Sequence, residues 1–199
     1  VAYEALERGI TPSDCIDFCR RARSRHADTP IVIMTYLNPV LAYGIERFAA
    51  DAGAAGVDAM ILVDLPPEEA ASARSAFGAH DIDIVFLVSP TSSDERLAYI
   101  TSQASGWVYC VSIAGVTGAR AELPPELPSF LARVRRCTGL PLAVGFGISR
   151  REHIEALSGL ADGVIVGSAF MDVIRRAGEE GAPEAILRYT ESLSGRTPV

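Results

Sequence analysis

The chain has 199 residues, of which 49% are hydrophobic and 22% are charged, and its formal net charge is −7 at pH 7. That length and composition suffice for one globular domain with a sizeable core. The acidic balance argues against a nucleic-acid partner or an anionic membrane surface, because both attract basic proteins. No apolar stretch approaches the roughly 20 residues that cross a bilayer, and we expect no signal peptide at the start of the chain.

Cysteine and histidine are the residues that would reveal a metal site or a disulfide framework. The four cysteines are Cys15, Cys19, Cys110 and Cys137. The three histidines, each expected at the surface without a catalytic role, are His26, His80 and His153. Only the first two cysteines are close in sequence, and two thiols four residues apart on a helix are too few ligands for zinc. The sequence therefore predicts no metal site and reduced thiols in a cytoplasmic protein.

Helical and strand patterns alternate along the whole chain. In chain order, the first expected elements are a helix over 12–24, a strand over 31–36, a turn at Asn38–Pro39, a helix over 44–54, a strand over 59–63, a helix over 68–79 and a strand over 84–88. The remaining ones are a helix over 94–103, a strand over 107–112, a glycine-bearing loop over 115–125, a helix over 127–138, a strand over 142–145, a helix over 150–157, a strand over 163–166 and one or two helices over 169–193.

The strands predict the fold class. Each is short and apolar without alternation, which is typical of parallel strands that are buried on both faces. Successive strands start about 25 residues apart, which matches repeated βα units. We therefore predict an α/β protein with a single domain over 1–199, a (β/α)8 TIM barrel of which only six of the eight βα units are present. An open parallel sheet is the alternative.

Two glycine turns follow the last two expected strands, and they favour the barrel. Gly145 and Gly147 follow one strand, and Gly167 with Ser168 follows the other. Glycine lets the backbone approach an anion closely, and a following helix start presents free N–H groups to that anion. Neighbouring strand–glycine–helix units form the phosphate pocket of many (β/α)8 barrels. The turns therefore predict a phosphorylated substrate.

Asp64 lies at the carboxyl end of an expected strand, where barrel enzymes place functional groups. Its carboxylate would orient a substrate or a neighbouring group there. It would equally serve as a cap for the helix expected over 68–79. Position alone leaves both interpretations open.

Three aromatic residues are candidates for a pocket lining. Tyr36 and Tyr109 are expected at strand ends, where a ring can line an aromatic pocket and a hydroxyl can donate a hydrogen bond. The equal alternative is that both are core residues at the rim of the sheet. Phe146 lies between two glycines and is expected to cover a flat ring.

A long glycine-bearing loop follows the strand expected over 107–112. Loops of this length in a barrel are often lids over the site, so we expect this one to be mobile without ligand. Gly118 can supply a backbone donor to an anion, and Arg120 can neutralise phosphate or be solvated. A plain surface loop is the alternative.

Five stretches of the sequence resemble a known family, and they occur in the same order as in that family. They read PIVIMTYLNP over 30–39, GVD over 56–58 with DLPPEE over 64–69, YCVSIAGVTG over 109–118, GFGIS over 145–149 and GVIVGS over 163–168. Together these stretches closely resemble the alpha chain of tryptophan synthase, the indole-3-glycerol-phosphate lyase. The resemblance extends over nearly the whole chain.

The resemblance implies a (β/α)8 barrel that cleaves indole-3-glycerol phosphate by a retro-aldol reaction to indole and glyceraldehyde 3-phosphate, in tryptophan biosynthesis. It further implies that indole passes to a beta chain in an alpha2-beta2 assembly. The pyridoxal phosphate (PLP) of that assembly belongs to the beta chain, so no cofactor is expected here.

The resemblance also assigns site residues. The backbone around the substrate's phosphate would come from Gly118, Gly145, Gly147, Gly167 and Ser168. The indole ring would be surrounded by Tyr36, Ile61, Leu87, Tyr109 and Phe146. The positions near the beta-chain interface would be Asn38 and Asp64. Catalysis would be supported by Asp64, Tyr109 and the loop residue Thr117.

One part of the family's pattern is missing from this sequence. The family's catalytic glutamate and aspartate come from its first two barrel units, and neither can be assigned to a residue here. One alternative function is therefore a catalytically inactive partner that only binds a beta chain. Another is a different phosphate-binding barrel enzyme, which the aromatic lining and the lack of a lysine at any strand end disfavour.

Overall fold

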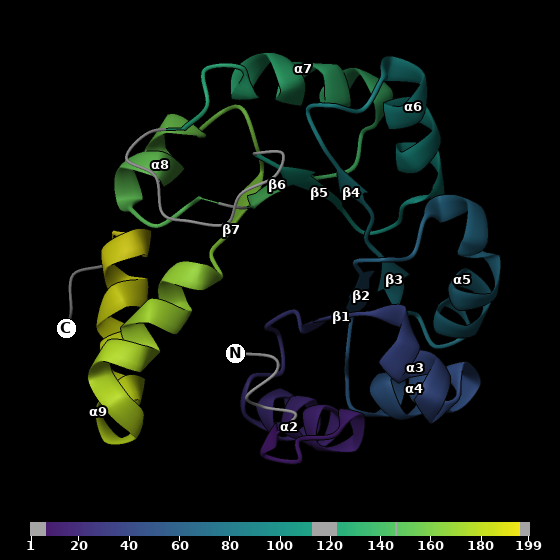
Figure 1. Cartoon of the computed structure of the whole chain (residues 1–199), viewed down its shortest axis with the longest axis vertical. Helices are drawn as coiled ribbons and strands as arrows, with labels where there is room; N and C mark the ends of the chain where they lie inside the picture. Colours follow the sequence, from purple (N-terminus) through teal and green to yellow (C-terminus); the bar gives the residue numbers. More distant parts are fainter. Residues whose placement is uncertain (1–6, 113–122, 146, 196–199) are drawn as a thin grey trace. The chain divides into compact units, whose positions relative to one another are not determined.

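The computed structural model describes residues 7–112, 123–145 and 147–195. Its contacts divide the chain into two compact units, which are described separately. The first unit comprises Val1–Phe86 and Gln103–Gly106, and the second comprises Leu87–Ser102 and Trp107–Val199. Each unit has its own parallel β-sheet with helices in the connections (Figure 1).

The first unit has a three-stranded parallel sheet in the order β1-β2-β3. Its strands are β1 (Val32–Thr35), β2 (Ala59–Leu62) and β3 (Asp83–Ile84). Its helices are α2 (Pro12–Arg25), α3 (Leu37–Tyr43), α4 (Ile45–Ala54), the short 3-10 helix η1 (Pro67–Glu69) and α5 (Ala71–Gly78). The central strand β2 is buried at every position, as its unbroken apolar sequence predicts.

Helix α2 shows how local sequence sets an element boundary. The Thr11 side chain accepts a hydrogen bond from the Asp14 amide, and the Asp14 carboxylate accepts one from the Thr11 amide at 2.8 Å. This reciprocal capping box satisfies amides that would otherwise lack partners, and Pro12 suits the first helical turn. The hydrogen bonds from Thr11 lower the pKa of the Asp14 carboxyl.

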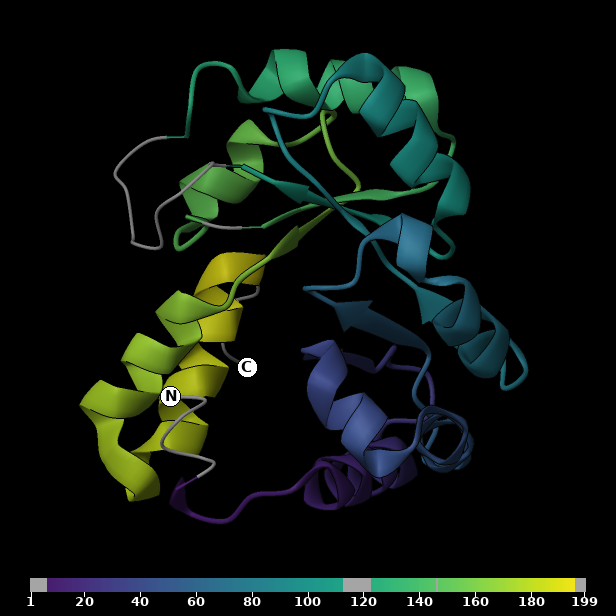
Figure 2. The ribbon, with the colours of Figure 1, turned by 45° about the vertical axis from the view of Figure 1, so that its right-hand side comes forward.

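The second unit has a four-stranded parallel sheet in the order β4-β5-β6-β7. Its strands are β4 (Leu87–Val88), β5 (Val108–Val111), β6 (Leu142–Gly145) and β7 (Gly163–Ile165). The helices in its connections are α6 (Asp94–Gln103), α7 (Leu127–Cys137), α8 (Arg151–Ala156) and α9 (Ser168–Ser194). Helix α9 is kinked at Gly178, whose φ of 71° is left-handed, so it forms two helical halves (Figure 2).

Three expectations about the elements are wrong in detail. The strand expected over 84–88 is two strands, β3 and β4, because the run changes from β2 to β5 as its pairing partner. Asn38–Pro39 is not a turn but lies in the first turn of α3, where a proline costs no hydrogen bond. The helix expected over 68–79 is interrupted at Ala70, whose ψ of 1° separates η1 from α5.

An arginine–aspartate clasp holds the amino ends of β1 and β2 in the first unit. Asp58 directly precedes β2, and its carboxylate accepts a hydrogen bond at 2.6 Å from the Ile31 amide at the start of β1. The same carboxylate pairs with Arg23 of α2 at 2.5 Å. The Arg23 guanidinium also donates to the Gly56 carbonyl at 2.7 Å. One helix and two strands are thereby joined at a single carboxylate.

The second unit repeats this clasp at the amino ends of β6 and β7. Asp162 directly precedes β7, and its carboxylate accepts a hydrogen bond from the Leu142 amide at 2.7 Å. It also pairs with Arg135 of α7, which donates to the Leu140 carbonyl at 2.9 Å. The Leu142 hydrogen bond, followed by Arg135, lowers the pKa of the Asp162 carboxyl from its ordinary value of 3.8. The repeated geometry indicates a structural role for both aspartates.

No helix within the described ranges is both long enough and apolar enough to cross a membrane.

We expect Asp162→Ala to lower the free energy of unfolding by about 1–2 kcal/mol, because the Leu142 amide loses its acceptor. Since the folded pKa is lowered, the carboxylate stabilises the fold above its unfolded pKa, and this contribution disappears as pH falls through the folded pKa. The difference between wild type and variant should therefore be full near pH 6 and shrink below about pH 4. Urea unfolding at several pH values measures it.

Asp172→Ala is the matched control. Asp172 is also half-exposed and paired with an arginine, Arg175, but this pair lies within one turn of α9. Exposed pairs of this kind contribute little. An equal loss of stability in both variants would contradict the clasp.

Candidate functional site

The carboxyl ends of the four strands in the second unit form one edge of its sheet. In parallel α/β folds this edge carries the functional groups, because all strands end there and the loops that follow are free to vary. At this edge the buried Ser112 follows β5, and its amide donates to the Gly145 carbonyl at the end of β6 at 3.0 Å. The two glycine turns predicted from the sequence lie at the same edge.

Gly145 is required by a close contact with Tyr109. A Cβ atom at this position would overlap the hydroxyl and the ring of Tyr109. Tyr109 is only 4% exposed, and its ring stacks on Trp107 with centroids 6.0 Å apart. Burial raises the pKa of the Tyr109 hydroxyl to about 12, so the phenol is protonated at neutral pH and is able to donate a hydrogen bond.

Tyr109 lies inside β5 and not at its end, so this part of the sequence prediction is wrong. Its register partner in the neighbouring strand is Leu87 of β4. Two residues in register on parallel strands have side chains on the same face. The structure therefore brings together two of the residues expected around an aromatic ring.

The second turn consists of Gly167 and Ser168 at the start of α9. Gly167 is the N-cap residue, and a Cβ atom built on it would meet no atom within 4 Å. Both residues are exposed. The first amides of a helix have no intrahelical partner, and the helix dipole makes this end favourable for an anion. The open space beside Gly167 is suited to a bound group.

The turn after β6 is held by residues that the sequence analysis assigned no role. Gly147 has a left-handed φ of 78°, which favours glycine. The Ser149 amide donates to Nδ1 of His153 at 3.3 Å, and the Ser149 carbonyl accepts from the Tyr189 hydroxyl at 2.8 Å. His153 is 4% exposed, so its expected surface position is wrong. It lies on the buried face of α8, and the sequence alone does not show which face of this helix is buried.

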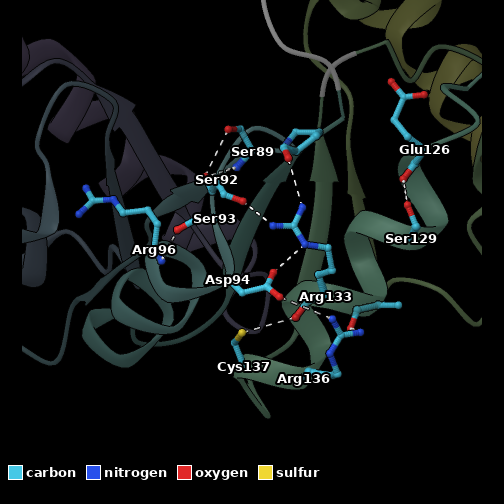
Figure 3. A network of polar contacts seen from close by, with 12 residues as sticks. Ser89, Ser92, Ser93, Asp94, Arg96, Glu126, Ser129, Arg133, Arg136 and Cys137 are labelled. Carbon is cyan, nitrogen blue, oxygen red and sulfur yellow. Dashed lines mark hydrogen bonds and ion pairs between the residues drawn. The ribbon is translucent and has the colours of Figure 1, made fainter.

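A polar network that no sequence pattern indicates fixes the loop that follows β4 (Figure 3). The Arg133 guanidinium from α7 donates to the carbonyls of Pro90 at 3.3 Å and Ser92 at 2.5 Å. It also pairs with the Asp94 carboxylate at 2.7 Å. The Ser93 hydroxyl accepts from the Arg96 amide at 3.2 Å and caps α6. One arginine thereby holds a loop at the functional edge.

The first unit carries the other site residues predicted from the sequence. Tyr36 follows β1, as expected, and is 61% exposed. Asp64 accepts a hydrogen bond from the Leu37 amide at 2.8 Å, so its carboxylate caps α3. The helix that Asp64 caps is therefore α3 and not the one expected over 68–79, and its role toward a substrate stays a prediction. Ile61 is buried inside β2, and Asn38 lies in the first turn of α3.

Several predicted site residues lie outside the described part of the chain. They are Thr117, Gly118, Arg120 and Phe146. The glycine-bearing loop expected to be mobile also lies mostly in this part. The roles of these residues stay predictions.

No group of three or more histidine, cysteine or acidic side chains within the described ranges is arranged to hold a metal ion. All four cysteines carry free thiols. Burial raises the pKa of the Cys110 thiol to about 12 and also raises that of Cys19. Both thiols are therefore protonated at neutral pH and are poor nucleophiles.

Comparison with known protein families identifies a match over almost the whole chain. A family model described as tryptophan synthase alpha chain matches residues 1–194. The tryptophan synthase alpha chain of Roseiflexus sp. (strain RS-1) is 47% identical over 191 residues, which is 96% of this chain and 73% of the relative. That of Geobacter sulfurreducens is 46% identical over 172 residues, 86% of this chain and 65% of the relative. The chain thus spans about two thirds to three quarters of their length.

Solved structures agree with these relatives. The tryptophan synthase complex from Pyrococcus furiosus contains a chain that matches with a TM-score of 0.88 at 38% identity, over 97% of this chain and 77% of that one. A structure described as the tryptophan synthase a2b2 complex from the same organism matches with a TM-score of 0.88 at 40% identity, over the same shares. The α/β fold is therefore that of the TIM-barrel alpha subunits.

We expect Gly145→Ala to lower the free energy of unfolding by about 2–3 kcal/mol, because the new methyl group overlaps the buried Tyr109 side chain. The double variant Gly145→Ala/Tyr109→Ala removes the overlap, so its loss should be clearly smaller than the sum of the two single losses. Thermal or urea unfolding of the three variants measures this coupling. Additive losses would contradict the proposed contact.

Proposed function

The chain belongs to the tryptophan synthase alpha chain family, and we propose that it takes part, as such a chain, in cleaving indole-3-glycerol phosphate to indole and glyceraldehyde 3-phosphate. The observation that carries this proposal is the pair of glycine turns at the carboxyl edge of one sheet, beside the buried tyrosine of β5. The turns suit a phosphate, and the tyrosine face suits an aromatic ring.

We propose that the substrate's phosphate binds at the two turns. Gly147 and Gly167 leave the backbone accessible. The amides in the first turn of α9, which begins at Ser168, would donate to phosphate oxygens. Gly145 lies beside this group at the end of β6, and Gly118 is proposed as a further backbone donor. The described part of the site does not depend on a charged side chain, because helix-start amides and the dipole supply the positive field.

The indole ring is proposed to contact the face shared by Tyr109 and Leu87. Apolar side chains remove the ring from water, and the protonated phenol of Tyr109 is able to donate to a polar atom of the substrate. Tyr36, Ile61 and Phe146 are proposed as the further lining. A small sugar phosphate would gain nothing from such a lining, which disfavours a different phosphate-binding barrel enzyme.

Retro-aldol cleavage needs one proton delivered to the indole ring carbon and one removed from the glycerol hydroxyl, so a positioned acid–base pair is required. We propose that the family's catalytic glutamate and aspartate are not among these 199 residues. The sequence then contributes six of the eight βα units of one barrel domain. Thr117 is proposed to help organise the catalytic aspartate.

We further propose that the chain binds a tryptophan synthase beta chain in an alpha2-beta2 assembly, in the cytoplasm. One Pyrococcus furiosus structure is described as the tryptophan synthase a2b2 complex. Asn38 and Asp64, at the carboxyl ends of β1 and β2, are the proposed contact positions. The chain itself needs no cofactor, because PLP serves the reaction of the beta chain.

The direct test is indole formation from indole-3-glycerol phosphate, measured with the protein isolated from its own cells and again with the 199 residues alone, each with and without a beta chain. We expect indole from the isolated protein and none from the 199 residues. Indole formation by the 199 residues at the same rate would contradict the proposal that the acid–base pair lies elsewhere. Capture of a beta chain without indole in either sample would favour the non-catalytic partner.

Gly167→Ala tests the phosphate site. The methyl group meets no protein atom, so we expect the melting temperature to change by only a few degrees. It would occupy the space proposed for phosphate oxygens, so affinity for glycerol 3-phosphate should fall about tenfold or more, measured by calorimetry. Gly139→Ala is the control, because Gly139 also has open space for a Cβ atom but lies after α7, away from the turns. Equal affinity in all three proteins would overturn the proposed site.

Asp64→Asn and Asp64→Ala separate the structural and partner roles of this carboxylate. The asparagine variant still offers a side-chain oxygen to the Leu37 amide, so we expect stability close to wild type, whereas the alanine variant should lose about 1 kcal/mol. Both variants lack the charge, so both should bind a beta chain several-fold more weakly in a surface-binding assay. Unchanged beta-chain affinity in both would contradict the proposed contact.

A further inference from the structure

Tyr189 lies in the second half of α9 and reaches the turn that follows β6. Its hydroxyl donates to the Ser149 carbonyl at 2.8 Å, across 40 residues of sequence. Its side chain is half-buried, and burial raises the pKa of its hydroxyl, so it is a protonated donor at neutral pH. Tyr189 therefore contacts one of the two turns directly.

The ring of Tyr189 also contacts the beginning of the same helix. It meets Phe170 edge-to-face, with centroids 5.0 Å apart and an interplanar angle of 75°. Phe170 lies in the first turn of α9, two residues after Ser168. This contact exists because the left-handed Gly178 folds the second half of the helix back beside the first, as Figures 1 and 2 both show. Tyr189 thus contacts the surroundings of both turns.

Ser149 is held through both of its backbone groups. Its carbonyl accepts from Tyr189, and its amide donates to Nδ1 of the buried His153. The neighbouring Ile148 is 3% exposed, so the segment after Gly147 is anchored in the core. Ser149 is therefore linked through Tyr189 to Phe170 in the first turn of α9.

From these contacts we propose that Tyr189 is a positioning residue, which holds the turn after β6 in register with the start of α9 so that both point their backbone donors at one anion. This inference rests on the proposed phosphate site. Two sets of amides bind one anion tightly only when their spacing is fixed before binding. Otherwise the conformational entropy lost in ordering them reduces the binding free energy. His153 holds the same residue through the Ser149 amide.

Tyr189→Phe tests the inference, because it keeps the ring contact with Phe170 and removes only the hydroxyl. We expect the Kd for glycerol 3-phosphate, measured by calorimetry on the full chain, to rise about 3–10-fold while the melting temperature stays within a few degrees of wild type. In the indole-forming enzyme, KM should rise by a similar factor with kcat little changed. A purely structural role would lower the melting temperature and leave the affinity of the folded protein unchanged.

Tyr43→Phe is the matched control. It removes a hydroxyl that donates to the Asp51 carboxylate at 2.7 Å, and both residues belong to the first unit, whereas the turns belong to the second. We expect its Kd to equal that of wild type. Phe170→Leu, which removes the other contact of Tyr189, should weaken binding in the same direction as Tyr189→Phe.

The outcomes separate the two proposals. If wild type does not bind glycerol 3-phosphate, the phosphate site is wrong and the role of Tyr189 is wrong with it. If wild type binds and Tyr189→Phe binds equally well, the phosphate site stands and only the role of Tyr189 is overturned. An equal rise of Kd in the Tyr43→Phe control would also overturn it.

Discussion

An arginine–aspartate clasp at the amino ends of two strands fixes one strand pair in each of the two sheets. In each unit, one carboxylate directly before a strand accepts a hydrogen bond from the amide at the start of the preceding strand. It also pairs with an arginine from the helix that comes before that preceding strand. A one-residue slip would exchange the two faces of a strand. The clasp at Asp162 fixes β7 against β6, and the clasp at Asp58 fixes β2 against β1.

Structure and proposed function are divided between opposite ends of the same strands. The amino ends carry charged side chains that are satisfied within the protein. The carboxyl edge of the second unit has exposed backbone at Gly167, and the buried phenol of Tyr109 lies against Gly145 at the end of β6. This division suits a barrel enzyme. The residues that stabilise the fold can stay the same while the loops at the other end change in sequence and carry different catalytic residues. Arg133 has a similar supporting role at the carboxyl edge. From α7 it donates hydrogen bonds to two carbonyls of the loop that follows β4.

Most elements could be located from the sequence because the strands form short apolar runs, although β1 and β7 have no buried residue in the structure. Prediction failed where the outcome depends on a partner distant in sequence. The run over 84–88 is apolar throughout, yet only the pairing with β2 and β5 divides it. Asn38–Pro39 has the composition of a turn, but the Asp64 carboxylate caps a helix there by accepting from the amide of Leu37, 27 residues away. His153 was predicted at the surface, but it lies on the buried face of α8.

The fold class, the family and the two glycine turns could be predicted before folding is considered, because they depend on local apolar runs and on residues without side chains. The folded chain was needed to explain why position 145 must be glycine, since the atoms that exclude a methyl group belong to Tyr109, 36 residues away. It likewise decided the place of Tyr189, whose hydroxyl meets Ser149 only because α9 folds back at Gly178. Contacts of this kind arise from packing between elements, and no periodicity along one element encodes them.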